Sequence, residues 1–250
     1  MLVYPTTEKL KALRLHGMAK SFEEQKDSSD YDDMSFEERL GLLVDREVTE
    51  QENRRLTVRL RHAKLRQHCC IEDIDYRQHR GIDKSLMKSL STCRWIKEHL
   101  NILLTGPCGV GKSFIACALG HKACLEGYRV FYTRSSRLFE NLALTRGDGR
   151  YNKLMNNLAR TDLLIMDDWG LSVLTDRERR DLLEVFEDRH QIRSTIITSQ
   201  LPVEHWHKTI GNPTLADAIL DRLIHNAHKI QLKGVSMRKI KARREVDNGR

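Results

Sequence analysis

The stretch Asn101–Ser113 constrains this chain more than any other part of the sequence. It begins with the apolar run Ile102–Leu104, which is typical of a buried strand. It continues as GPCGVGKS, which matches the phosphate-loop pattern G-x-x-x-x-G-K-[ST] at every fixed position. Glycines let the backbone turn its N–H groups towards a polyphosphate. Residues 114–125 contain no proline and predict a helix whose N-terminal dipole favours the same anion. Strand, loop and helix in this order predict a nucleoside triphosphate site.

Each fixed position of the loop has a chemical task. Lys112 is expected to reach the β- and γ-phosphates, and the Ser113 hydroxyl is expected to bind Mg²⁺. The predicted nucleotide-binding residues are Gly106, Pro107, Cys108, Gly109, Val110, Gly111, Lys112, Ser113 and Phe114.

A second apolar run, Leu163–Met166, ends in two acids, which is the Walker B pattern of a phosphate-loop enzyme. Asp167 is expected to hold Mg²⁺ through water, beside Ser113, and Asp168 is expected to polarise the attacking water. The chain between Lys112 and Asp167 has room for the helices and strand of a doubly wound sheet.

The remainder of the chain after residue 68 alternates apolar runs with amphipathic segments, which predicts an α/β fold with a parallel sheet. Further strands are expected at 129–133, 194–200 and 227–232, and helices at 82–99, 138–145, 151–159, 177–191 and 213–225. Residues 134–137 are expected to form a polar, basic loop, and the polar end of strand 194–200 is expected to contact the γ-phosphate or a water molecule.

Residues 1–68 are expected to form a helical module that precedes an ATPase-type domain at 69–250. An acidic loop is predicted at 27–33, and Ser35 with Glu38 forms a capping-box pattern that opens a long helix. Two interpretations of the module remain open: a DNA-binding or assembly module, and a helical bracket on the second domain.

Basic residues are concentrated in two runs. The formal net charge is +8, with 43 Lys and Arg against 35 Asp and Glu, and the excess lies mainly at 54–68 and 222–250. Either run alone fits a solvated helix face, whereas two runs beside a nucleotide site favour a nucleic-acid partner. The candidate DNA-binding residues are Arg54, Arg55, Arg59, Arg61, Lys64, Arg134 and Arg137.

Other classes of protein fit the sequence poorly. It has no apolar run near the roughly 20 residues of a membrane span, and its N-terminus lacks the apolar core of a signal peptide. The 6 cysteines include no CxxC pair, so a reducing cytoplasm is expected. No acidic-triad pattern for DNA-strand chemistry is present.

With these motifs in hand, the chain resembles the IstB-like ATP-binding proteins, which are AAA+ transposition helper ATPases of bacterial insertion sequences and relatives of the replicative-helicase loaders. The resemblance covers almost the whole chain, and its most specific part runs from Thr195 to Lys239. The stretches that carry it are LKALRLHGMAKSFEEQ, GPCGVGKS, LLIMDDWG, IITSQLPVEHWH, NPTLADAILDRLIHNAHKIQLKG and SMRK.

The resemblance implies an AAA+ core with a short helical C-terminal part, and it implies further site residues. It places Gln200 near the sensor-1 position, Arg222 at the arginine finger offered to a neighbouring subunit, and Arg238 at sensor 2. Two departures from the AAA+ pattern are visible: Asp168 replaces the commoner Glu, which implies slow hydrolysis, and Gln200 stands where Asn is usual.

The function implied by the resemblance is ATP- and Mg²⁺-dependent assembly of several subunits on duplex target DNA, with DNA-stimulated ATP hydrolysis and recruitment or stimulation of a transposase. Two alternatives remain open. One is a helicase loader that acts on a hexameric helicase and single-stranded DNA. The other is a DNA scaffold that binds ATP with negligible turnover.

Overall fold

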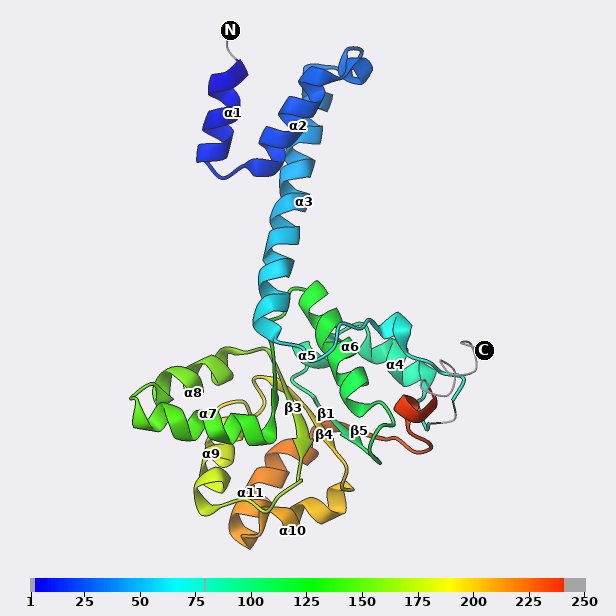
Figure 1. The fold of residues 1–250 in the computed structure, drawn as a ribbon, viewed down its shortest axis with the longest axis vertical. Helices are drawn as coiled ribbons and strands as arrows, with labels where there is room; N and C mark the ends of the chain where they lie inside the picture. The colour runs from blue at the N-terminus through cyan, green and yellow to red at the C-terminus, as the bar shows by residue number, and fades with distance from the viewer. Residues whose placement is uncertain (1–2, 79, 241–250) are drawn as a thin grey trace. The chain divides into compact units, whose positions relative to one another are not determined.

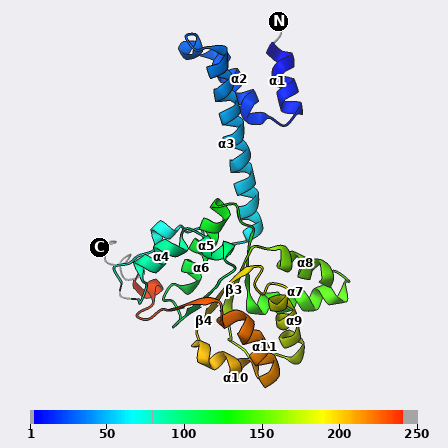
Figure 2. The same ribbon diagram turned by 180° about the vertical axis from the view of Figure 1, so that it is seen from behind.

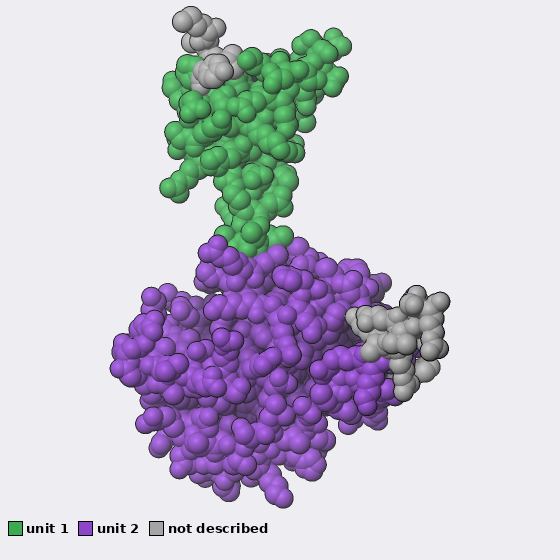
Figure 3. Space-filling view, viewed as in Figure 1, with its two compact units in different colours: residues 1–58 green, residues 59–250 purple. Residues whose placement is uncertain are grey.

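The computed structural model describes residues 3–78 and 80–240 of the chain (Figures 1 and 2). Its contacts define two compact units, residues 1–58 and 59–250, which Figure 3 colours separately. The boundary lies within one long helix, α3 (Phe36–Ala63). By its contacts the last turn of α3 belongs to the second unit, because Ala63 is fully buried and the Arg59 Nε donates to the Cys124 carbonyl at 2.9 Å. The functional boundary expected after residue 68 stays a prediction.

The first unit contains α1 (Val3–Ala12), α2 (His16–Asp27), a 3-10 turn η1 (Ser29–Tyr31) and most of α3. The buried Glu47 carboxylate on α3 accepts hydrogen bonds from the backbone N–H groups of Gly17 (2.7 Å) and Met18 (3.1 Å). A carboxylate at this end of α2 satisfies free N–H groups and complements the helix dipole. The predicted capping box precedes α3, with Ser35 and Glu38 exchanging backbone-to-side-chain bonds of 2.8 and 3.3 Å.

The second unit is built on a parallel sheet, as the sequence predicts. Five strands of the described chain pair in the order β2-β3-β4-β1-β5, and every neighbouring pair is parallel. Their bounds are β1 Asn101–Thr105, β2 Val130–Arg134, β3 Leu163–Trp169, β4 Ser194–Ser199 and β5 Ala227–Gln231. Since β1 lies between β4 and β5, the carboxyl end of β1 opens into the crevice where parallel α/β sheets bind ligands.

Helices cover both faces of this sheet (Figures 1 and 2). One face carries α6 (Lys112–Leu125), with η2 (Ile71–Asp73), α4 (Lys84–Leu90) and α5 (Arg94–Lys97) on the same side. The opposite face packs a continuous hydrophobic core of strand and helix side chains. The helices on that side are α7 Ser135–Gly147, α8 Tyr151–Arg160, α9 Asp176–Glu187, α10 Trp206–Ile210 with its 3-10 turn η3 Val203–His205, and α11 Pro213–Ile224.

Two predicted elements are wrong. The single helix expected at 82–99 is divided into α4 and α5, because Cys93 between them adopts the left-handed backbone conformation (φ 56°) and ends the helical run. The basic loop expected at 134–137 does not exist: Arg134 is the last residue of β2, and Ser135 begins α7 directly. The buried Ser135 hydroxyl donates to the Asp167 carbonyl at 3.2 Å and so fixes the start of that helix to β3.

No helix in the described ranges combines the length and apolar character that a membrane-spanning segment needs.

Candidate nucleotide site

The phosphate loop connects the carboxyl end of β1 to the first turn of α6, as predicted. Gly109 (φ 84°) and Gly111 (φ 106°) adopt backbone conformations that other residues rarely adopt. Both also face close neighbours: a Cβ on Gly109 would collide with the Ser236 side chain, and one on Gly111 would lie 2.6 Å from an Arg80 guanidinium nitrogen. The glycines therefore permit both the turn of the loop and the close packing around it.

The Lys112 amine points back into the loop. Its Nζ donates to the carbonyl oxygens of Gly106 (2.7 Å) and Pro107 (2.8 Å), and the residue is only 7% exposed. Burial lowers the pKa of Lys112. An anionic phosphate in the loop would offset this desolvation, because it favours the charged amine.

The Asp167 carboxylate is fully buried and accepts bonds from three hydroxyl groups. The Ser113 Oγ donates to Oδ1 at 2.8 Å, and the Thr198 hydroxyl at the end of β4 donates to the same oxygen. The Tyr132 hydroxyl, from β2, donates to Oδ2 at 2.5 Å. Burial first, and then this bond, raise the pKa of Tyr132, so the phenol stays a donor. The Arg66 guanidinium lies 3.6 Å from Oδ2 as well.

The donor set at Asp167 fits a magnesium ion. Ser113 Oγ and Asp167 Oδ1 are hard oxygen donors only 2.8 Å apart, and Mg²⁺ binds through one or two carboxylates together with substrate phosphates. Within the described ranges, no group of three or more His, Cys, Asp or Glu side chains is placed to hold a metal ion on its own. A divalent cation here would therefore depend on the oxygens of a nucleotide.

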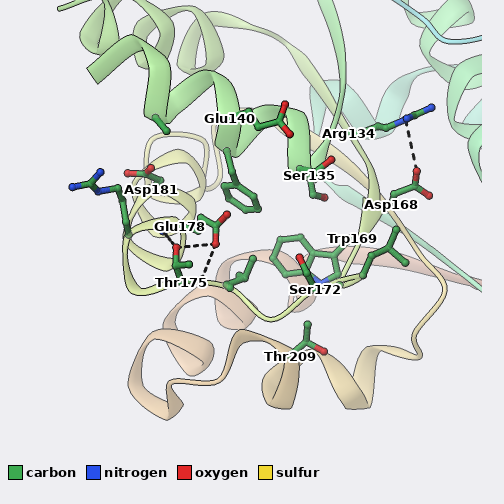
Figure 4. Close-up of a pocket in the computed structure, with 17 residues that line it drawn as sticks. Arg134, Ser135, Glu140, Asp168, Trp169, Ser172, Thr175, Glu178, Asp181 and Thr209 are labelled. Carbon is green, nitrogen blue, oxygen red and sulfur yellow. Dashed lines mark hydrogen bonds and ion pairs between the residues drawn. The ribbon is translucent and has the colours of Figure 1, made fainter. Parts of the chain in front are cut away.

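Asp168 faces a different environment from Asp167. Its backbone is left-handed (φ 60°), at an irregularity in the pairing of β3 with β4, and its N–H donates to the Thr198 hydroxyl at 3.2 Å. Asp is one of the residues that tolerate this conformation. The partly exposed carboxylate lies 3.8 Å from the Arg134 Nε. Both residues line a cavity of about 500 Å³ together with Ser135 and Trp169. Figure 4 shows the four side chains and the Arg134–Asp168 contact.

The structure brings Gln200 and Arg238 to the phosphate loop. An Arg238 guanidinium nitrogen donates to the Cys108 Sγ at 3.2 Å, and the neighbouring Met237 N–H donates to the Gly109 carbonyl at 2.9 Å. The exposed Gln200 lines a second cavity, of about 330 Å³, together with Gly106 and Pro107. Phe114 follows the loop in the first turn of α6.

Arg222, in contrast, lies at the opposite end of β1. Asn101, the first residue of that strand, donates from its Nδ2 to the Arg222 carbonyl at 3.3 Å. The Arg222 guanidinium pairs with Glu187 and donates to the Ala218 carbonyl at 2.8 Å. Since the phosphate loop leaves the other end of β1, this arginine is not placed to contact a nucleotide in its own subunit.

Arg80 is a site residue that no sequence motif identified. It is 4% exposed, and its guanidinium donates to the Val110 carbonyl at 2.9 Å and to the Asp75 carbonyl at 2.5 Å. The Val110 C=O and the Gly111 N–H belong to the same trans peptide and therefore point in opposite directions. The hydrogen bond from Arg80 to the Val110 carbonyl thus directs the Gly111 N–H away from Arg80. Burial lowers the pKa of Arg80. Tyr132, in the middle of β2, and Thr198, near the polar end of β4, were also missed individually.

Several candidate DNA-binding residues already have partners within the chain. Arg54 lies 3.6 Å from both Glu47 and Glu50, and the Lys64 amine lies 5.8 Å from the centre of the Phe131 ring. Arg59 and Arg134 make the contacts given above. Arg55, Arg61 and Arg137 are exposed. Residues 241–250 of the C-terminal basic run lie outside the described residues.

Comparisons with known proteins add independent information. Residues 8–245 match the family model described as IstB-like ATP binding protein. A putative insertion sequence ATP-binding protein of Sinorhizobium fredii is 54% identical over 244 residues, which are 98% of this chain and 100% of that protein. A putative ATP-binding protein of insertion sequence IS1162 from Pseudomonas fluorescens is 47% identical over 203 residues, 81% of this chain and 88% of that one.

Solved structures resemble this chain at lower identity. The crystal structure of DnaI has a TM-score of 0.57 at 18% identity and covers 66% of this chain and 92% of its own. AMPPCP-bound DnaA from Aquifex aeolicus has a TM-score of 0.56 at 19% identity, covering 74% of this chain and 56% of its own. At these identities the similarity concerns the fold alone.

Arg80→Met is expected to weaken binding of a fluorescent ATP analogue by about tenfold or more, because the variant lacks a charged hydrogen bond of about 1.5–3 kcal/mol that orients the loop. Arg80→Lys should recover part of the affinity. Arg77→Met, an exposed arginine in the same segment, is the matched control. If Arg80→Met folds and binds the analogue with wild-type affinity, Arg80 does not orient the loop.

Proposed function

Because this chain belongs to the IstB-like ATP binding protein family and has the AAA+ P-loop fold, we propose that it is an ATPase that assembles on duplex DNA and recruits or stimulates a transposase. The observation that carries the catalytic part of this proposal is the 2.8 Å bond between Ser113 and Asp167. It joins the phosphate loop to the acid of β3 and forms the oxygen cluster that an ATP-bound Mg²⁺ needs.

Each residue of the site then has its own role in ATP hydrolysis. Lys112 binds the β- and γ-phosphates, while Ser113 and Asp167 hold Mg²⁺, which supplies charge neutralisation on the phosphoryl oxygens. Asp168 orients and polarises the attacking water. Its contact with Arg134 at 3.8 Å would have to loosen for this task, in line with the slow hydrolysis that an Asp at this position implies. Gln200 and Arg238 contact the phosphates from the β4 side and from the C-terminal segment.

Arg222 supplies the missing cation to a neighbouring subunit. A guanidinium stays charged and grips the developing charge on the γ-phosphoryl oxygens. Its distance along β1 from its own phosphate loop supports a role in a second subunit rather than in its own. A head-to-tail contact of this kind gives a ring or a helical filament, and DNA is able to template either.

The role in transposition rests on the relatives. Those that match most of the chain are named as insertion sequence ATP-binding proteins, whereas the likeness to DnaI and to the DnaC helicase loader is one of fold. We therefore favour the function of a transposition helper over that of a helicase loader. Phosphate release measured with and without duplex DNA distinguishes both from a scaffold with negligible turnover. A transposase gene beside the gene for this chain would favour the helper.

Lys112→Ala should abolish ATP binding or hydrolysis, because the variant lacks the loop cation that binds the β- and γ-phosphates. Asp168→Asn should keep ATP binding but slow hydrolysis, since Ser113 and Asp167 are untouched. Binding of a fluorescent ATP analogue and phosphate release separate the two effects. Wild-type turnover in Lys112→Ala would end the assignment of the phosphate loop.

Arg222→Ala should leave ATP binding by the isolated subunit intact and cripple hydrolysis, because comparable fingers accelerate phosphoryl transfer by about 10³–10⁵-fold. Mixing Arg222→Ala with Lys112→Ala protein should restore part of the phosphate release, since one subunit supplies the finger and the other the loop. Full activity of Arg222→Ala alone would show that the Glu187 pair is purely structural and that each subunit hydrolyses ATP unaided.

Duplex DNA binding should weaken steeply with salt and depend little on sequence, because interactions with DNA phosphates dominate it. The slope of the logarithm of the DNA-binding constant against the logarithm of the salt concentration measures the number of phosphate contacts. Changing the exposed Arg55 and Arg61 to Gln should make this slope less steep by up to about one unit for each arginine that binds a phosphate in the wild type. The exposed pair Arg94 and Lys97, changed to Gln, is a charge-matched control. If the Arg55/Arg61 variant and the Arg94/Lys97 control have the same slope, the basic end of α3 does not bind DNA and is a solvated helix face.

A further inference from the structure

Arg66 lies outside every nucleotide motif, yet it reaches the acid at the centre of the site. It follows the end of α3 at Ala63 and belongs to the same basic run as the candidate DNA-binding residues. One of its guanidinium nitrogens is 3.6 Å from the Asp167 Oδ2, whereas its side chain keeps 40% of its surface exposed. The ion pair therefore joins a solvent-accessible cation to a fully buried carboxylate.

The partners of Asp167 are divided between its two oxygens. Oδ1 accepts from Ser113 and Thr198, and it is the oxygen beside the hydroxyl that would share a divalent cation. Oδ2 accepts from Tyr132 and faces Arg66. One oxygen is thus anchored by a phenol and a guanidinium, and the other is directed to the phosphate loop.

We infer that Arg66 is a positioning residue for Asp167, which anchors Oδ2 and sets the affinity of the site for its divalent cation. This inference rests on the proposed ATP and Mg²⁺ site. A positive charge on the same carboxylate repels an incoming dication and competes for the negative charge that would bind it. Arg66 consequently raises the cation concentration that the nucleotide complex requires.

The coupling acts in both directions. If Arg66 disfavours the cation, the bound cation must weaken the hold of Arg66 on Asp167 by the same factor. The chain immediately after α3 is then tied more tightly to the site when the cation is absent than when it is present. Any interaction that draws Arg66 away from Asp167, such as an anion on its exposed side, favours cation binding.

Manganese binding tests the inference without relying on turnover. Full-length wild type, Arg66→Gln, Arg66→Lys and Arg94→Gln are titrated with Mn²⁺ at saturating non-hydrolysable ATP analogue, and free Mn²⁺ is followed by electron paramagnetic resonance. Arg66→Gln should bind Mn²⁺ about three- to tenfold more tightly, a modest range because the arginine is partly exposed. Arg66→Lys should stay close to wild type, since it keeps the charge. Arg94→Gln removes an exposed charge from α5 and should match wild type.

Unchanged or weaker Mn²⁺ binding in Arg66→Gln, with analogue binding intact in the presence of EDTA, would overturn the inference and leave the ATP site standing. If the wild type binds neither the analogue nor Mn²⁺, both the proposed function and this inference fail.

A second measurement needs no substitution. Hydrogen exchange of wild-type peptides that contain residues 64–68 is compared for the analogue complex with EDTA and with Mg²⁺. Faster exchange with Mg²⁺ would support the inference, because Arg66 then holds the segment less tightly, and equal or slower exchange would overturn it.

Discussion

A buried carboxylate is costly unless its charge is matched, and the second unit is arranged around one. Asp167 has no exposed surface, so its desolvation must be offset by hydrogen bonds and by a nearby cation. The three hydroxyls and the guanidinium that do this come from α6, β2, β4 and the chain after α3. These segments meet only if β3 lies between β2 and β4, and β4 beside β1. The order of the strands therefore determines whether the groups that stabilise the Asp167 charge can meet.

The sequence predicted what depends on local pattern. All five strands were expected within a few residues. For β1, β3 and β4 the reason is that a strand buried on both faces appears as an apolar run. The errors lie where a tertiary contact decides the outcome. Nothing local marks Cys93 as a left-handed residue that divides α4 from α5, and the basic residues around Arg134 suggested a loop although Ser135 begins a helix fixed to β3. Propensity is a weak guide when such contacts compete with it.

In the site, too, local motifs could be predicted from the sequence, whereas long-range contacts could not. The phosphate loop and the acids of β3 are contiguous motifs, so their meeting across the Ser113–Asp167 bond could be expected. Arg80 and Arg66 reach the site through long-range contacts with Val110 and Asp167. A basic residue in a basic run looks the same in the sequence whether it faces solvent, DNA or a buried carboxylate. Only the fold distinguishes these environments.

The two ends of β1 connect nucleotide chemistry to assembly. The strand has five residues, so it spans about 16 Å between Asn101, which binds the Arg222 carbonyl, and the start of the phosphate loop. A guanidinium reaches far less than this, and it is also held by Glu187 on its own subunit. On the proposed function, a subunit alone therefore binds ATP but lacks one cation for the transition state. Only a neighbour that presents its own Arg222 completes the site, so ATP hydrolysis would report that the assembly has formed.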